Sequence, residues 1–310
     1  MHNALLYILT AIIWGSTWIA IEFQLGEVPV MVSLVYRFGI SALLMWGYCL
    51  YKKLPLRYTK KDHLFIFLMA LFNFSMNYVL IYYSQYHLTS AMTSIIFSTM
   101  LLMNIINTRL FFGNKISHRV YIGALFGILG IVILFWHELS ATTSSDDSNI
   151  IFGFSLAIGS SLAASFGNMA SVRNSSKSIN IFSANAWGML YGTLILVTLV
   201  FITGAEFTIS TELSYLVSLG FLSVFGTVIA FATFYILLTN MGPEKASYVI
   251  VLIPIVAVLI STVFEDFTWT SNTFIGFISV LTGNAILLTP LEKLRHFIDR
   301  NSIVKNKTTN

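Results

Sequence analysis

The sequence predicts an all-α integral membrane protein with ten transmembrane helices, arranged as two inverted five-helix repeats. Its composition is the first reason: 56% of the 310 residues are hydrophobic, only 10% are charged, and the mean hydropathy is +0.81. A soluble core of this size cannot hide so much apolar surface, so lipid must be the solvent. The other two reasons are the order of the apolar segments and a repeat at a spacing of 153 residues.

A spanning helix needs about 20 apolar residues, and the first half of the chain offers five such segments, each ended by turn or polar residues. These segments and the breaks after them are 4–22 before Gly26 and Pro29, 30–51 before the basic stretch 52–63, 64–83, 90–111 before Gly113, and 119–136 before the polar run 140–149. The first segment has no basic residues before it and no cleavage site after it, so we expect a retained span and not a signal peptide.

The second half offers five more segments, which also end at turn, polar or charged residues. They are 150–172 before Arg173, 182–203 before Gly204, 214–238 before Gly242 and Pro243, 246–264 before Glu265 and Asp266, and 271–289 before the basic tail 291–310. No connecting segment is long enough for a soluble domain. We therefore predict a first repeat over 1–140, a second over 150–290, and a cytoplasmic basic tail over 291–310.

Charge sorting supports the ten-span topology. With ten spans, 16 of the 17 basic residues fall on the side that holds both termini: Lys52, Lys53, Arg57, Lys60, Lys61, Arg109, Lys115, Arg119, Arg173, Lys177, Lys245, Lys293, Arg295, Arg300, Lys305 and Lys307. The opposite side carries acidic residues, among them Glu22, Glu27 and Glu265. By the positive-inside rule, both termini are predicted to be cytoplasmic.

The repeat appears when 153 is subtracted from residue numbers in the second half. Tyr235 then falls on Tyr82, Gly276 on Gly123 and Gly283 on Gly130. Because five is an odd number of crossings, the second repeat must enter the membrane from the opposite side. Inverted repeats provide two conformations of similar energy, each open to one face of the membrane, which is the usual basis of alternating access. A duplication retained for packing alone is the alternative.

Short motifs in the same order along the chain resemble the EamA family of the drug/metabolite transporter (DMT) superfamily. They are Trp14-Gly15-Ser16, Arg37-Phe38, Gly123 with Gly130, Pro254, and Ile275-Gly276 through Gly283. The resemblance implies two EamA repeats, a ten-helix fold, and efflux of amino acids or other small metabolites across a bacterial cytoplasmic (inner) membrane. The chain departs from the family pattern at Leu101, where a proline is common, and at Gly113-Asn114, where Gly-Glu is common.

Arg37 is the only formally charged residue placed well inside a predicted span. A charge at such depth costs at least about 2.5 kcal/mol, so its side chain should face a cavity or a partner. Its guanidinium could bind a substrate carboxylate through two parallel hydrogen bonds. The alternative is structural: an ion pair with Glu22, or hydrogen bonds to backbone carbonyls that join the first two helices.

Asparagines are the second group of candidates, because lipid cannot satisfy a primary amide. Asn73 and Asn77 lie four residues apart on one face of the third segment, and we predict that they contact substrate. Asn168, on the sixth segment, is a further candidate. Such amides also join helices to one another, and that reading remains open.

Two aromatic residues near mid-span, Trp14 and Tyr191, are candidates for the cavity lining, with core packing as the alternative. Ser98 is a further candidate, although its hydroxyl could simply bond a carbonyl one turn back. Pro254 should kink the ninth helix, either as a static bend or as a gating hinge. Gly123 with Gly127, and Gly188 with Gly192, form GxxxG spacings that could pack helices within the monomer or in a homodimer.

Several classes of function find little support. None of the six histidines shows metal-ligand spacing, and Cys49 is the only cysteine, so we expect no metal, no other cofactor and no disulfide. No glycine-rich loop could cradle phosphates, which argues against ATP-driven pumping. The basic residues sit in short turns and form no nucleic-acid patch. No acidic residue occupies mid-membrane, so proton coupling would depend on Glu22 or Glu265, with exchange and facilitated diffusion equally open.

The sequence therefore predicts a secondary transporter, not an enzyme, that exports amino acids or similar small polar metabolites by alternating access. Its expected partners are a small-molecule substrate and the lipid bilayer. We expect the substrate site at mid-membrane, between the two halves. The alternative is a non-transporting membrane scaffold held together by the GxxxG faces.

Overall fold

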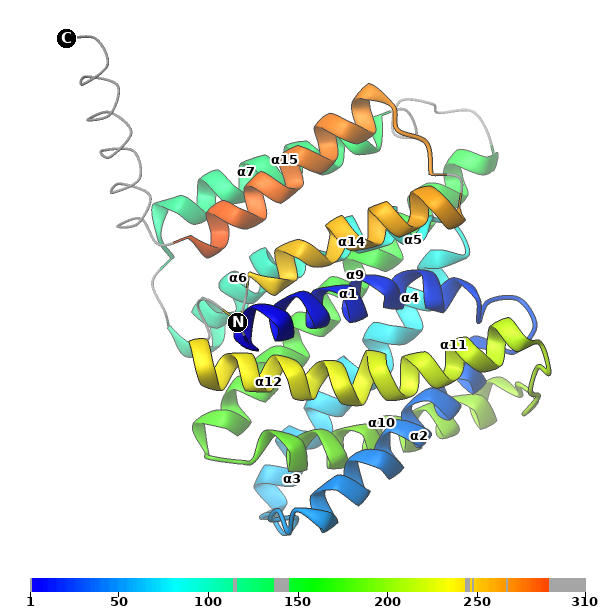
Figure 1. Ribbon diagram of the computed structural model, residues 1–310, viewed down its shortest axis with the longest axis vertical. Helices are drawn as coiled ribbons and strands as arrows, with labels where there is room; N and C mark the ends of the chain where they lie inside the picture. Colours follow the sequence, from blue (N-terminus) through cyan, green and yellow to red (C-terminus); the bar gives the residue numbers. More distant parts are fainter. Residues whose placement is uncertain are drawn as a thin grey trace.

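The computed structural model describes residues 2–113, 116–136, 145–242, 246, 248–265 and 267–289, and every regular element in these ranges is a helix. The predicted tail 291–310 lies outside the described residues. The helices run side by side across the molecule (Figure 1). The N-terminus and the C-terminal end of the last helix lie at the same end of the bundle (Figure 1).

Eight helical segments are long and apolar enough to cross a membrane. In chain order they are α1 (His2–Glu22), α2 (Val30–Tyr51), α3 (Lys60–Met69) continued by η1 (Ala70–Met76) and α4 (Asn77–Gln85), α5 (Ser90–Phe97) with α6 (Met100–Phe112), α9 (Ser145–Ser176), α10 (Ile181–Thr203), α11 (Leu213–Ser223) continued by η2 (Val224–Ile229) and α12 (Ala230–Met241), and α15 (Ser271–Leu288). Two apolar helices are shorter, α7 (His118–Leu134) with 17 residues and α14 (Val249–Phe264) with 16. They fall short of the roughly 20 residues that a straight crossing needs, so the count of ten spans stays a prediction.

Capping residues explain where several helices begin and end. The Thr59 side chain accepts a hydrogen bond from the Asp62 backbone N–H at 3.2 Å, so α3 begins at Lys60, four residues before the predicted 64. The Asn180 side chain caps α10 in the same way. Gly113 follows α6 at a φ of +73°, a left-handed conformation that suits glycine and ends a helix.

The helices α7 and α15 form a tightly packed antiparallel pair at one edge of the bundle (Figure 1). A Cβ added at Gly123 would lie 2.8 Å from the Gly283 carbonyl oxygen, and one at Gly130 would lie 2.7 Å from that of Gly276. Such backbone contact is possible only without side chains. The 153-residue shift maps Gly123 onto Gly276 and Gly130 onto Gly283, so it converts each of these two glycine contacts into the other.

Two membrane-spanning segments contain a π-helical stretch in the middle. Ala70–Met76 joins α3 to α4, and Val224–Ile229 joins α11 to α12. Adding 153 to 70–76 gives 223–229, so the two stretches lie at corresponding places in the two halves. A π-helical turn inserts an extra residue and rotates the side chains that follow, and such turns are frequent at functional sites.

Candidate functional site

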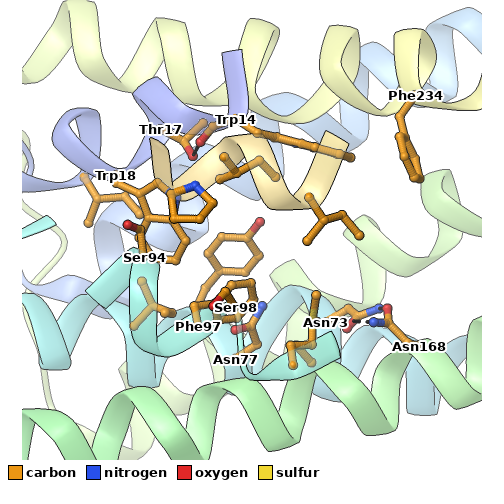
Figure 2. A pocket seen from close by; sticks show the side chains of 18 of the residues that line it. Trp14, Thr17, Trp18, Asn73, Asn77, Ser94, Phe97, Ser98, Asn168 and Phe234 are labelled. Atoms are coloured by element: carbon orange, nitrogen blue, oxygen red, sulfur yellow. Dashed lines mark hydrogen bonds between the residues drawn. The ribbon is translucent and has the colours of Figure 1, made fainter. Parts of the chain in front are cut away.

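A cavity of about 270 Å³ lies in the interior of the bundle, and side chains from five of the long helical segments and from the shorter helix α14 line it (Figure 2). The lining consists of Trp14, Thr17, Trp18 and Ile21 from α1; Asn73, Phe74, Asn77, Tyr78 and Ile81 from η1 and α4; Ser94, Phe97, Ser98, Met100 and Asn104 from α5 and α6; Ala164 and Asn168 from α9; Phe231 and Phe234 from α12; and Ile250, Ile253 and Pro254 from α14. Five of the predicted site residues and the predicted hinge are therefore in the lining.

Three asparagines from different helices form one hydrogen-bonded chain at the cavity wall. Asn73 Nδ2 donates to Asn168 Oδ1 at 3.3 Å, and Asn168 Nδ2 donates to Asn104 Oδ1 at 3.3 Å. The dashed line in Figure 2 marks the first of these bonds. Asn73 comes from the π-helical stretch η1, which aims it toward α9. Polar groups of three helices thus converge on one point of an otherwise apolar bundle.

A glycine on α9 makes room for the Asn73 side chain. A Cβ added at Gly167 would lie 2.3 Å from Asn73 Oδ1 and 2.4 Å from its Cγ. Real Cβ atoms essentially never approach another atom so closely. Gly167 was not selected from the sequence, although Asn73, the amide whose position Gly167 fixes, was selected.

Asn77 lies one turn after Asn73 and is buried, with 6% of its surface exposed. The Ser160 hydroxyl on α9 donates to Asn77 Oδ1 at 2.6 Å. No hydrogen bond to Asn77 Nδ2 is present among the described residues, and this nitrogen belongs to a side chain that faces the cavity. Asn77 is therefore held by its oxygen and presents its donor group to the cavity.

Aromatic side chains make up the opposite wall. The Trp14 ring lies 5.1 Å from that of Phe234 and 5.7 Å from that of Phe231, and the Trp18 ring lies 5.3 Å from that of Phe97 (centroid distances). In Figure 2, Trp14 and Trp18 face the asparagines across the cavity. The site therefore has an amide wall and an aromatic wall, a common division in pockets for small organic molecules.

Ser98 and Pro254 both line the cavity where a helix is locally weakened. Ser98 lies between α5 and α6, and its hydroxyl donates to the Ile95 carbonyl oxygen at 2.6 Å. Pro254 lies inside α14, where its missing N–H removes one helical hydrogen bond. Both residues thus stand where two neighbouring segments could bend beside the cavity.

Arg37 lies just outside the cavity lining and is 1% exposed. Its guanidinium donates to the Tyr82 hydroxyl at 3.4 Å and lies 4.5 Å from the centre of the Tyr78 ring. Within the described residues no carboxylate forms an ion pair with it, and this includes Glu22. The Tyr78 ring, itself part of the lining, separates Arg37 from the cavity.

Tyr191, the remaining predicted site residue, also lies outside the lining. Its hydroxyl is 2.9 Å from His63 Nδ1, and its ring packs against Trp187 at 5.4 Å. The first contact joins α10 to the first turn of α3, and the second lies within α10, one turn before Tyr191. The structure thus brings Trp14, Asn73, Asn77, Ser98 and Asn168 together and leaves Arg37 and Tyr191 apart from them.

A carboxylate at the end of α14 joins that helix to the start of α5. Glu265 accepts hydrogen bonds from the Ser90 backbone N–H at 2.9 and 3.2 Å, and from the hydroxyls of Ser90 and Ser261. The anion sits where the first N–H groups of α5 point outward, a favourable place for negative charge. The helix α5 packs against α14, α9 and α1, whereas α6 packs against α9 and α15.

Three of the four glycines in the two GxxxG spacings face close neighbours within the same chain, whereas a Cβ added at Gly127 would meet nothing within 4 Å. A Cβ at Gly188 would lie 2.7 Å from Met69 Cε, and one at Gly192 would lie 2.8 Å from Phe74 Cβ. Gly123 faces α15, as described above. Packing within the monomer therefore accounts for Gly123, Gly188 and Gly192.

Several cavity residues that sequence reasoning did not select share a helix face with a residue that it did select. Trp14, Thr17, Trp18 and Ile21 occupy positions i, i+3, i+4 and i+7 on one face of α1. Phe74, Tyr78 and Ile81 occupy one face of η1 and α4 in the same way. Apolar residues occur all round these helices, so the hydrophobic pattern does not identify the faces that line the cavity. Only the predicted residues Trp14, Asn73 and Asn77 indicate those faces in the sequence.

Comparisons with known proteins cover almost the whole chain. The sequence profile of the EamA-like transporter family matches residues 2–136 and again 151–289. An uncharacterized transporter encoded in the trpA 3' region of Buchnera aphidicola is 24% identical over 86% of this chain and 84% of its own length. The uncharacterized inner membrane transporter YedA of Escherichia coli is 27% identical over 81% of this chain and 79% of its own length. A protein of known crystal structure has the same fold, with a TM-score of 0.65 and 16% identity over 92% of this chain and 96% of that chain.

Proposed function

Because this chain belongs to the EamA-like transporter family, we propose that it is a secondary transporter that exports amino acids or similar small polar metabolites by alternating access. The cavity carries this proposal. Amides that are only partly hydrogen-bonded inside an apolar bundle cost free energy of folding. Binding a solute during transport would explain why the protein has them. The substrate contacts are Trp14, Asn73, Asn77, Ser98 and Asn168.

The proposed topology is ten crossings in two inverted repeats over 1–140 and 150–290. Two observations support it. The glycine contacts between α7 and α15 exchange under the 153-residue shift, as expected for a self-complementary contact about a two-fold axis. The two π-helical stretches also correspond under that shift. For α7 and α14 to cross the bilayer, polar residues at their ends or local thinning of the bilayer must make up for their length.

The conformation seen here is proposed to be closed on the outer side. The outer half of the fourth segment, α5, is bound to α14 through Glu265 and packs on α1. Both halves pack on α9, and the inner half, α6, also packs on α15. In the opposite conformation the bond between Glu265 and Ser90 would break, and α6 would close on α1 and α14.

The proposed location is a bacterial inner membrane with both termini in the cytoplasm. The family relative YedA is named as an inner membrane transporter. The distribution of basic residues in the sequence predicts the orientation through the positive-inside rule. Export is the direction that the resemblance to the EamA family implies.

Arg37 and Tyr191 have separate proposed roles. In this conformation Arg37 stabilises the contact of α2 with α4, through its bond to Tyr82 and its stacking on Tyr78. Reading a substrate carboxylate would require Tyr78 to move aside. Tyr191 holds α10 against α3 through His63, which supports the packing reading over substrate contact.

The test is transport by the purified protein. Proteoliposomes are loaded with a labelled extract of small metabolites, and saturable loss of any component is measured against protein-free liposomes. We expect Asn77→Leu to abolish this flux without lowering the amount of folded protein in the membrane. Wild-type protein that moves no solute would contradict the proposal and favour the scaffold alternative, whereas equal flux in Asn77→Leu would contradict only the site.

A further inference from the structure

The cavity leaves hydrogen-bonding groups of both kinds unused. Asn104 and Asn77 each accept through Oδ1, and neither Nδ2 has a hydrogen-bond partner among the described residues. Asn73 has the opposite balance, because one of its N–H groups bonds Asn168 while its Oδ1 has no partner in the described part of the chain. Donors and an acceptor therefore stand side by side on one wall. An amide or nucleobase edge, which carries both N–H and C=O, complements that set.

Charge is missing from the same wall. No described residue in the lining is acidic or basic, and Arg37 is covered by the Tyr78 ring at 4.5 Å. A solute ion placed in this cavity would give up its hydration without gaining a counter-charge, which costs several kcal/mol. The lining therefore discriminates against a solute with a net charge.

Size and shape narrow the choice further. About 270 Å³ is slightly below the range of about 300–1,000 Å³ that is typical of ligand pockets. Opposite the amides stand the indole rings of Trp14 and Trp18, and the phenyl ring of Phe97 lies 5.3 Å from that of Trp18. Flat faces of this kind stack on planar rings.

Building on the proposed transport function, we infer that the solute is an uncharged planar ring of nucleobase size, with an amide-type edge of adjacent N–H and C=O groups. That edge binds Asn73, Asn77 and Asn104, and the ring lies against Trp14 and Trp18. Among the small polar metabolites of the proposed function, the cavity therefore selects a neutral heterocycle over an amino acid or another carboxylate.

The experiment uses three labelled probes in proteoliposomes of the full-length protein: uracil, orotate and phenylalanine. Uracil has the proposed edge and no charge. Orotate is the same ring with an added carboxylate, so the pair isolates the effect of charge. Phenylalanine represents a zwitterionic amino acid with an aromatic ring. Saturable flux is measured after subtraction of the leak through protein-free liposomes.

We expect saturable uracil flux at least tenfold above that of orotate, because the carboxylate of orotate would lose its hydration without gaining a counter-charge. We expect the same margin over phenylalanine, because a site built to pair a donor–acceptor edge rejects solutes that leave it unpaired. Orotate or phenylalanine moving faster than uracil would overturn this inference and leave the proposed transport function standing. Absence of flux for all three probes would also overturn it. The flux measurement with the labelled metabolite extract, described above, then tests whether the protein transports any solute.

A matched pair of variants tests the amide wall. Asn104→Leu removes two unused donors, and we expect about a tenfold loss of uracil affinity. Asn240→Leu is the control, because Asn240 is an exposed amide of α12 whose Nδ2 bonds Asn3 at 2.9 Å outside the cavity. Equal uracil affinity in both variants contradicts the inference. If Asn104→Leu does not fold, competition between unlabelled uracil and orotate on the wild-type protein decides the same question.

Discussion

The glycine behind Asn73 offers a sharp test of the site, because one added carbon should move one amide. Replacing Gly167 by alanine places a Cβ 2.3 Å from Asn73 Oδ1, whereas ordinary contacts begin at 3.4 Å. The amide must therefore retreat by about 1 Å, the difference between these two distances. Its bond to Asn168 is already 3.3 Å long and would pass the 3.5 Å limit of a hydrogen bond.

The expected loss follows from that single bond. A net contribution of about 0.5–1.5 kcal/mol per hydrogen bond corresponds to a roughly two- to tenfold increase in the KM for transport, since 1.4 kcal/mol is a factor of ten. Alanine is also a better helix former than glycine by about 1 kcal/mol. This gain offsets part of the lost hydrogen bond, so the variant should still fold.

The control is on the same helix. At Gly159 an added Cβ would meet Leu80 Cδ1 at 3.6 Å, an ordinary contact, so Gly159→Ala should transport like the wild type. A double-mutant cycle separates the clash from any general effect on α9: in an Asn73→Ala background, Gly167→Ala should cost nothing further. An unchanged KM in Gly167→Ala, or an equal loss in both backgrounds, would refute the assigned role of Gly167.

Three further predictions follow from the packing. Glu265→Gln weakens the bonds to Ser90, so the backbone N–H of Ser90 should exchange hydrogen several-fold faster; an unchanged exchange rate would remove the proposed closing contact. Gly130→Ala should lower the melting temperature of the purified protein by several degrees, because its Cβ would lie 2.7 Å from the Gly276 oxygen. Gly127→Ala is the control and should leave the melting temperature unchanged, because its Cβ meets nothing within 4 Å. Similar melting temperatures for the two variants would argue against the α7–α15 contact. Arg37→Gln should lower stability and leave the ranking of substrates unchanged, and loss confined to carboxylate solutes would show instead that Arg37 reads substrate charge.

Much of the fold follows from features that the sequence displays directly. The apolar segments lie within a few residues of the observed helices, because lipid requires long apolar stretches and turns interrupt them. The capping contact of Thr59 explains the one start that moved by four residues. The π-helical stretches were not predicted, since Ala70–Met76 has the same apolar composition as an ordinary helix.

The site was only partly predictable, for a different reason. Amides in lipid must point inward, so Asn73, Asn77 and Asn168 could be selected from the sequence alone. Depth in the membrane can be counted along a helix, but the direction of a side chain cannot be read from a helix that is apolar on every face. Tyr191 illustrates this limit, because its mid-span position suggested the cavity and its contact with His63 lies elsewhere. The same holds for Arg37. The sequence shows how deep Arg37 lies in its span, but not that the Tyr78 ring packs over its guanidinium.

The most direct test of alternating access is the accessibility of the cavity from each side of the membrane. Cys49 is the only cysteine and is fully buried, so a Cys49→Ala protein with Thr17→Cys carries one thiol, in the cavity lining. We predict that a membrane-impermeant thiol reagent labels it from the cytoplasmic side in the resting protein, and that adding transported solute shifts labelling toward the outer side. Labelling from neither side, or from both sides at equal rates that solute does not change, would contradict the account.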